Sequence, residues 1–280
     1  MTSQERTRTE ERESEETRDA SRSPGGGGQQ RTPSKGSGVA VRTLRYLGMP
    51  IFLAFVCLGL YLYIGSKDLD SIEQRSLNAG VLTQRLIEHV QIAGLSTVIV
   101  VTLAVTTGVL LTRPGIRRVT PVVVGLANIG QAVPSIGLLA LFAIIWTFGF
   151  WPAIVALVAY SFLSILRNTM VGLQQVDRST IEAARGMGMT KMATLFRIEL
   201  PLAVPIILAG IRTALIINVG TATLATFIGA GTLGELINNG IRLGRTDTVL
   251  VVGSVLTAVL ALFIDWLAGV AETILRPKGL

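Results

Sequence analysis

The chain has 280 residues, of which 50% are hydrophobic and only 15% are charged. A soluble domain usually carries about 25% charged residues, so this composition excludes an ordinary soluble core and indicates a polytopic membrane protein. The net charge of +7 does not point to nucleic acid, because basic loops facing an anionic membrane surface explain it more simply. The single cysteine, Cys57, excludes a disulfide within the chain.

Residues 1–45 are predicted to form a disordered cytoplasmic tail. The stretch up to residue 40 is rich in Glu, Arg, Ser and Thr and contains a glycine run at 25–28. Such a segment cannot bury enough apolar surface to fold alone. It is too long and too acidic for the start of a signal peptide. A regulatory or docking role for the tail stays open.

Apolar runs predict six membrane spans, of which the first occupies residues 46–65. Residues 66–91 are predicted to form an extracytoplasmic amphipathic segment, because apolar side chains recur there at helical spacing from Val81 to Val90. Pro134 lies inside the third span and predicts a kink. The remaining spans are expected at about 92–112, 120–147, 151–170, 201–228 and 247–270.

The distribution of basic residues predicts the orientation. With the N-terminus inside, loops and ends on the cytoplasmic side hold twelve Lys and Arg residues, Arg167 among them, and the outer loops hold five. Cytoplasmic loops carry the excess of basic residues in multispan proteins, so both termini are expected in the cytoplasm. This orientation also places residues 177–200, between the fourth and fifth spans, in the cytoplasm.

Residues 177–200 have a local pattern that predicts two short helices. Ser179 and Glu182 fit a capping box at the start of the first helix. Gly188 permits a turn at positive φ, and Thr190 can cap the second helix. Pro201 suits the first turn of the next span. The pattern therefore predicts a compact helix–turn–helix knob, of the kind that fits a groove on a soluble partner.

The spacing of this segment resembles the cytoplasmic EAA loop of binding-protein-dependent ABC importer permeases. The resemblance rests on Glu182, Ala183, Ala184, Gly188, Ile198, Leu200 and Pro201. It implies that a separate ATPase docks on the loop. The docking residues that we expect are Glu182, Ala183, Ala184, Gly188, Met192, Leu195, Ile198, Leu200 and Pro201.

Residues 85–275 further resemble the permease subunits of importers for glycine betaine, carnitine, choline or proline betaine. The segments that carry this resemblance lie at 131–135, 166–169, 199–203, 209–214, 218–225 and 228–234. The resemblance implies an all-α integral membrane protein with six transmembrane helices, in which residues 92–275 form a MetI-like permease core. It also implies a second permease subunit, identical or homologous, an ATPase pair and an extracytoplasmic substrate-binding protein. Thr232 stands where the family usually has Gly, a minor departure.

Polar side chains inside the spans are candidates for the translocation pathway, because each is costly in hydrocarbon unless it is partnered or hydrated. The alternative is that they form hydrogen bonds between helices. The spans carry amides and hydroxyls but almost no fixed charge, which suits weak binding of a passing zwitterion. Asp265 is expected to pair with a base such as Arg212 or to snorkel toward the interface, rather than to relay protons. The pathway candidates are Gln131, Ser135, Asn168, Asn218, Thr221 and Thr223.

Other chemical signals are weak. Gly229, Gly231 and Gly234 match a dinucleotide fingerprint, but they follow a span and lack the acidic partner, so a tight turn with close helix packing is expected. His89 is the only histidine, and it is expected at the membrane interface. The chain has no P-loop motif, so ATP hydrolysis is expected on a separate subunit, and this chain is not expected to be an enzyme. We expect no metal, no cofactor and no nucleic acid.

The preferred hypothesis is a plasma-membrane permease subunit of an ATP-driven osmoprotectant importer, with lipid around its spans. One alternative keeps this class and changes the substrate to methionine or another small solute. A second alternative is an ATP-independent secondary transporter, which would leave the EAA-like loop unexplained. The sequence identifies neither the exact substrate nor whether the second permease is identical.

Overall fold

The computed structural model describes the backbone of residues 35–275 and the side chains of residues 47–275, and no strand occurs in this part of the chain. The predicted tail up to residue 34 therefore lies outside the described residues. The chain divides into two units, residues 1–44 and 45–280. Helix α2 (Lys35–Gly65) begins within the segment predicted as tail.

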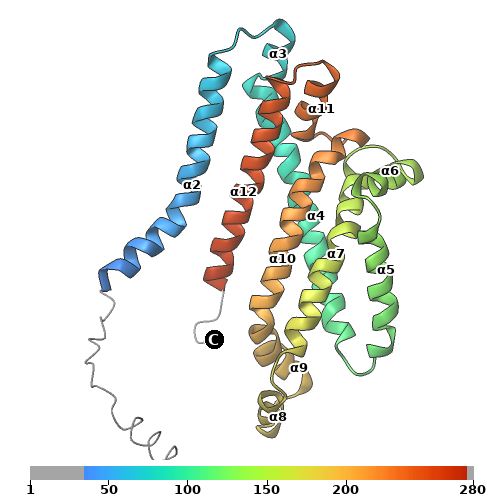
Figure 1. Ribbon diagram of the computed structural model, residues 1–280. Coiled ribbons are helices and arrows are strands. Elements are labelled where there is room, and N and C mark those ends of the chain that lie inside the picture. Colours follow the sequence, from blue (N-terminus) through green and yellow to red (C-terminus); the bar gives the residue numbers. More distant parts are fainter. Residues whose placement is uncertain (1–34, 276–280) are drawn as a thin grey trace, which may run out of the picture. The chain divides into compact units, whose positions relative to one another are not determined.

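Three long helices form the centre of the bundle (Figure 1). Small residues lie where these helices approach each other. They are α4 (Ala79–Leu111), α7 (Phe150–Gln174) and α10 (Leu200–Ala222). A Cβ added at Gly210 on α10 would lie 2.5 Å from the Cβ of Asn168 on α7, so only glycine permits this approach. Small residues allow such close backbone contact in membrane bundles.

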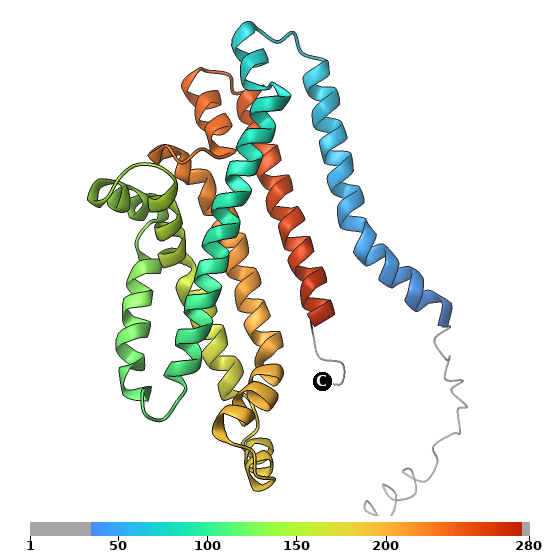
Figure 2. The same ribbon diagram turned by 180° about the vertical axis from the view of Figure 1, so that it is seen from behind.

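Helix α4 starts earlier than the second predicted span and runs the length of the bundle (Figure 2). Residues 79–91, expected to lie on the membrane surface, are the first turns of this continuous helix. Asn78 caps its start by accepting a hydrogen bond from the Gly80 backbone N–H at 2.7 Å.

The third predicted span is broken at Pro134, between α5 (Thr120–Ala132) and α6 (Ser135–Ile145), which meet at 100°. Val133 has an extended ψ of 133°, because proline disfavours the helical region for the residue before it. Pro134 itself also has a ψ of 133°. Five helical segments of the described chain are long and apolar enough to cross a membrane, and a sixth crossing counts only if this bent pair is one span. The break is thus sharper than the predicted kink.

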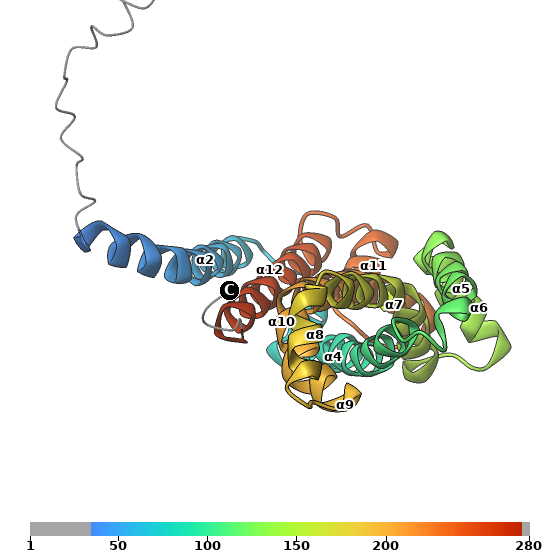
Figure 3. The same ribbon diagram turned by 90° about the horizontal axis from the view of Figure 1, so that it is seen from below.

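The second half of the chain alternates long and short helices. The short α8 (Arg178–Gly186) and α9 (Lys191–Thr194) lead through a π-helical turn, η2 (Leu195–Glu199), directly into α10. A 3-10 segment, η3 (Thr223–Ile228), then precedes α11 (Gly234–Arg242) and the last long helix, α12 (Val249–Leu275). A 3-10 turn, η1 (Arg117–Val119), precedes α5. We call the end of the bundle that carries α8 and α9 the loop end (Figure 3).

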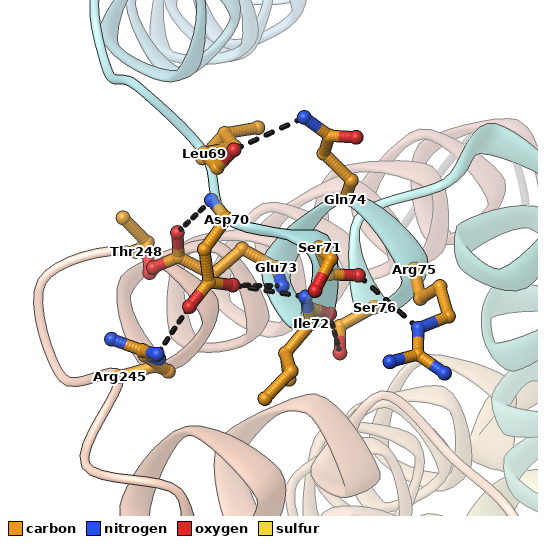
Figure 4. A network of polar contacts seen from close by, with 10 residues as sticks. All are labelled: Leu69, Asp70, Ser71, Ile72, Glu73, Gln74, Arg75, Ser76, Arg245 and Thr248. Atoms are coloured by element: carbon orange, nitrogen blue, oxygen red, sulfur yellow. Dashed lines mark hydrogen bonds and ion pairs between the residues drawn. The ribbon is translucent and has the colours of Figure 1, made fainter.

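The opposite end is held by polar contacts between α3 (Ser71–Ser76) and the segment that joins α11 to α12 (Figure 4). Asp70 caps α3 through the backbone N–H groups of Ile72 and Glu73, both at 2.9 Å. The Glu73 carboxylate accepts the Asp70 backbone N–H at 2.9 Å and the Thr248 hydroxyl. Arg245 pairs with Asp70. These contacts fix residues about 175 positions apart in the sequence to each other.

Candidate functional site

The loop end is built from the two short helices predicted for residues 177–200. Asp177, rather than Ser179, caps α8, and its carboxylate accepts the Ser179 backbone N–H at 3.0 Å and the Ser179 hydroxyl at 2.9 Å. The predicted capping box of Ser179 and Glu182 is therefore wrong, because the helix already begins at Arg178. The backbone N–H of Ser179 lowers the pKa of the Asp177 carboxyl.

The turn between the two helices has the predicted geometry. Gly188 has a φ of +86°, a conformation that side chains other than glycine rarely adopt. Backbone hydrogen bonds from Met187 to Ala183 at 3.0 Å and from Met189 to Ala184 at 3.2 Å close the end of α8. The Thr190 hydroxyl accepts the Ala193 N–H at 3.2 Å and caps α9, as expected.

The structure divides the predicted docking residues into outward and inward groups. Glu182, Ala183, Gly188 and Met192 are exposed. Ala184 and Leu195 are 1% and 5% exposed and pack inside the loop and against the bundle. The half-buried members of the set are Ile198, Leu200 and Pro201.

Two further apolar side chains are exposed on the same loop. Met187 is 78% exposed and Phe196 is 62% exposed, similar to Met192 at 63%. Phe196 lies in the π-helical turn η2, and Met187 lies at the end of α8, where helical periodicity gives no signal. The loop therefore presents three large apolar side chains that the described part of this chain leaves uncovered.

A nearly buried carboxylate connects the loop to α4. Glu199, at the end of the π-helical turn, pairs with Arg113, which follows the last turn of α4. The guanidinium Nη2 lies 2.6 Å from Oε2 and Nη1 lies 3.3 Å from Oε1, a two-bond arrangement that is strong and directional. The Glu199 side chain is only 7% exposed. The pair therefore connects the end of the loop segment to the residue that follows α4.

Among the predicted pathway residues, Asn218 is completely buried between α10 and α4. Its Nδ2 donates to the Thr97 hydroxyl at 3.0 Å, and its Oδ1 is buried without a partner in the described residues. Thr223 on the following segment also has a buried hydroxyl without a partner there. In this single chain Asn218 therefore connects two helices and does not face an open surface.

Gln131 and Asn168 both contact Ser164 on α7. The Gln131 amide lies 3.4 Å from the Ser164 hydroxyl, and the Asn168 amide donates to the Ser164 carbonyl at 2.7 Å. Both side chains are half-buried, as are Ser135 and Thr221. The structure thus brings Gln131 and Asn168 to one serine and leaves Asn218 on another helix pair.

His89 is buried, and the expectation of an interfacial surface position is wrong. Its side chain is on α4 with 0% exposure, and Nε2 lies 2.9 Å from the Val219 carbonyl on α10. Nδ1 has no partner among the described residues. The expectation failed because α4 begins at Ala79, so His89 lies within the bundle.

The expected pairing of Asp265 is confirmed. Arg212 on α10 donates to Asp265 on α12 through Nε at 2.6 Å and Nη2 at 2.9 Å, and it lies 3.5 Å from Glu272. A charged side chain within a membrane segment is stabilised by such a partner.

The glycine segment after η3 is a turn, as expected. Gly229 and Gly231 have φ values of +71° and +62°. A Cβ at Gly234 would lie 1.9 Å from the Thr223 carbonyl oxygen, so the backbones meet there.

Arg167 was counted with the cytoplasmic loops and ends, although it also lies within the predicted span 151–170. The structure places it in α7, seven residues before the helix ends at Gln174. Helix α7 therefore carries a fixed charge at this position.

The helical bundle, with its protruding loop between two long apolar helices, has the architecture of a membrane permease. Residues 104–276 match the family model of the binding-protein-dependent transport system inner membrane component. The chain belongs to this family of inner-membrane permease proteins, which confirms the resemblance stated from the EAA loop.

Curated relatives support the same membership. The chain is 41% identical over 203 residues to the choline transport system permease protein OpuBB of Bacillus subtilis, covering 72% of this chain and 92% of the relative. It is 41% identical over 223 residues to the osmoprotectant import permease protein OsmY of Salmonella typhimurium, covering 80% and 92%.

Solved structures show the same fold. A chain of the MetNI methionine ABC transporter in an inward-facing conformation is 26% identical, with a TM-score of 0.62 over 71% of this chain and 98% of that one. A chain of an amino acid ABC transporter is 19% identical with a TM-score of 0.61, which supports the fold alone. The expected MetI-like permease fold is therefore confirmed.

Proposed function

We propose that the chain is the permease subunit of an ATP-driven importer of osmoprotectants, small zwitterions or quaternary amines. The observation that carries this proposal is the identity of about two fifths to relatives named as choline and osmoprotectant permeases. Uptake of a zwitterion such as glycine betaine would use a second permease subunit and an extracytoplasmic substrate-binding protein. ATP hydrolysis would occur on a separate ATPase subunit, because this chain has no P-loop motif.

The exposed side of the EAA loop is the proposed ATPase dock. Glu182, Ala183 and Gly188 form its polar and small-residue part, and Met187, Met192 and Phe196 form its apolar part. Exposed apolar patches on a helical knob are typical of sites that enter a groove on a partner. Ala184 and Leu195 support the knob from inside.

Replacement of Met192 and Phe196 by Ala tests the dock. The double variant should fold and insert, because both side chains are more than 60% exposed, but it should recover much less ATPase in a pull-down. Ile144→Ala is the matched control, because Ile144 is 78% exposed on the distant helix α6. Equal ATPase recovery by the double variant and the control would contradict the dock.

The proposed orientation places the EAA loop and both termini in the cytoplasm and α3 outside. The support is the excess of basic residues in the loops on the EAA side. A reporter that is active only in the cytoplasm should give a signal after Gly186 and none after Asp68. The opposite pattern would overturn the orientation and, with it, the dock.

Transport is tested by reconstitution of the permease with its ATPase and receptor in liposomes. ATP-dependent uptake of labelled glycine betaine, carnitine or choline is expected. Uptake of methionine alone would replace the proposed substrate class and keep the permease function. Uptake of betaine that is driven by an ion gradient without ATP would contradict the ATP-driven mechanism.

A further inference from the structure

The arginine inside α7 differs from the other membrane arginine. Arg212 has two carboxylate partners, Asp265 and Glu272, whereas no ion pair forms at Arg167 among the described residues. The Arg167 side chain is exposed in the single chain. An unpaired charge within a membrane helix is expected to face a hydrated cavity or the bundle interior.

The guanidinium is held well inside the helices. Its Nη2 donates to Oδ1 of Asn128 on α5 at 2.8 Å. Asn128 is eight residues after the start of α5 and Arg167 is seven residues before the end of α7, which corresponds to about 10 Å from the loop end along each helix. The side chain therefore does not extend back along α7 to reach water at the loop end.

The neighbouring groups are polar and neutral. Asn128 is itself oriented by donating to the Val124 carbonyl at 2.8 Å, which aims its oxygen at Arg167. One helical turn further along both helices, Gln131 on α5 approaches Ser164 on α7 at 3.4 Å. Together Asn128, Gln131, Ser164 and Arg167 form a polar seam between the two helices.

The seam is flanked by apolar side chains that face outward. Leu126 and Ile129 on α5 are 65% and 62% exposed, and Val171 on α7 is 43% exposed. A guanidinium has five N–H donors in a planar fork, and only one contact to Asn128 is made here. The remaining donors match a carboxylate with two parallel hydrogen bonds.

We propose that Arg167, positioned by Asn128, binds the carboxylate of a zwitterionic substrate as it passes the seam. This inference rests on the proposed function and adds to it a chemical preference for substrates with a carboxylate. Glycine betaine and carnitine carry that group, whereas choline carries only the quaternary ammonium. The partial exposure of Arg167 keeps the contact weak enough for the substrate to leave.

Two variants separate binding of the carboxylate from a purely structural contact between α5 and α7. Asn128→Asp keeps the contact and gives Arg167 a carboxylate inside the protein, so it should occupy the site. Arg167→Gln keeps a hydrogen-bonding side chain and removes the charge. Each should lower the kcat/KM of ATP-dependent betaine uptake about tenfold, the loss expected for a hydrogen bond to a charged group, and leave choline uptake unchanged.

A labelling experiment tests the site without the receptor. Ser164→Cys in a Cys57→Ser background keeps Arg167 and Asn128 and places a thiol in the same seam. It should react with a charged, water-soluble thiol reagent in the assembled permease–ATPase complex. Glycine betaine should slow the reaction, and choline at the same concentration should not. Protection by both ligands or by neither, or a disulfide between two copies that betaine does not affect, would overturn the proposal.

The outcomes also distinguish this inference from the proposed function. If the wild-type complex imports no betaine or carnitine, the proposed substrate class is wrong. If the wild-type complex imports betaine and both variants lose betaine and choline uptake equally, or lose neither, the carboxylate site is wrong while the permease function stands.

Discussion

The loop end of the bundle and the end that carries α3 differ in how their polar and apolar side chains are covered. At the end opposite the loop, the cap of α3, Thr248 and Arg245 are joined by hydrogen bonds within the chain (Figure 4). At the loop end, large apolar side chains stay uncovered, and the nearly buried carboxylate of Glu199 pairs with Arg113. One end is therefore held by polar contacts within this chain, whereas the apolar side chains of the other form the proposed ATPase dock.

The pair at the loop end should give the largest single effect. Glu199→Ala leaves Arg113 without its carboxylate and should lower the free energy of unfolding by about 3 kcal/mol, the low end for a broken buried pair because Arg113 is partly exposed. It should also reduce uptake per ATP hydrolysed. Thermal unfolding of the purified permease and coupled uptake assays measure the two effects.

The exchanged variant, Arg113→Glu with Glu199→Arg, restores opposite charges at the same place. It should recover part of the stability and of the coupling. If the single variant uncouples nothing, the pair is only structural, and the loop and α4 communicate by another route.

At the opposite end, Glu73→Ala should have the next largest effect. The Glu73 carboxylate accepts both the Asp70 N–H and the Thr248 hydroxyl. Removal of this carboxylate should therefore lower the free energy of unfolding by about 2 kcal/mol. Hydrogen exchange should rise in residues 66–78 and leave α8 unchanged. Faster exchange in α8 as well would show that the two ends are not independent.

The turn at the loop end allows a matched comparison of two glycines. Neither Gly186 nor Gly188 has an atom within 4 Å of an added Cβ, but only Gly188 has a positive φ. Gly188→Ala should therefore lower the free energy of unfolding by about 1 kcal/mol through backbone strain. It should also reduce the amount of ATPase recovered in a pull-down. Gly186→Ala should change neither, and equal effects at both positions would contradict this reason.

The smallest effect is expected at the cap of α8. The pKa of Asp177 is lowered by the Ser179 N–H, so its stabilising contribution is present above the unfolded pKa of about 4 and is lost as the pH falls through the lower folded value. Asp177→Ala should fray α8 at neutral pH, and Asp177→Asn should keep the cap but lose its pH dependence. Hydrogen exchange of α8 at neutral and acidic pH measures both.

The turn at Gly188, the Thr190 cap and the pairing of Arg212 with Asp265 could be predicted from the sequence. The turn and the cap follow from local backbone preferences, and the pairing follows from the high cost of a charge in hydrocarbon. Apolar runs likewise located the long helices. Their boundaries were less certain, as the early start of α4 shows, because an amphipathic turn and a membrane span can form one continuous helix.

The sequence by itself determined the membrane class, the apolar helices and the EAA loop, because hydropathy and short spacings are local properties. Only the tertiary structure decided that His89 and Asn218 are buried, that Arg113 meets Glu199 86 residues away, and that Arg167 faces Asn128. Lipid-facing and protein-facing sides of a membrane helix are both apolar, so hydropathy does not distinguish them. Which polar groups meet depends on how α4, α5, α7 and α10 pack, and that is set by contacts far apart in the chain.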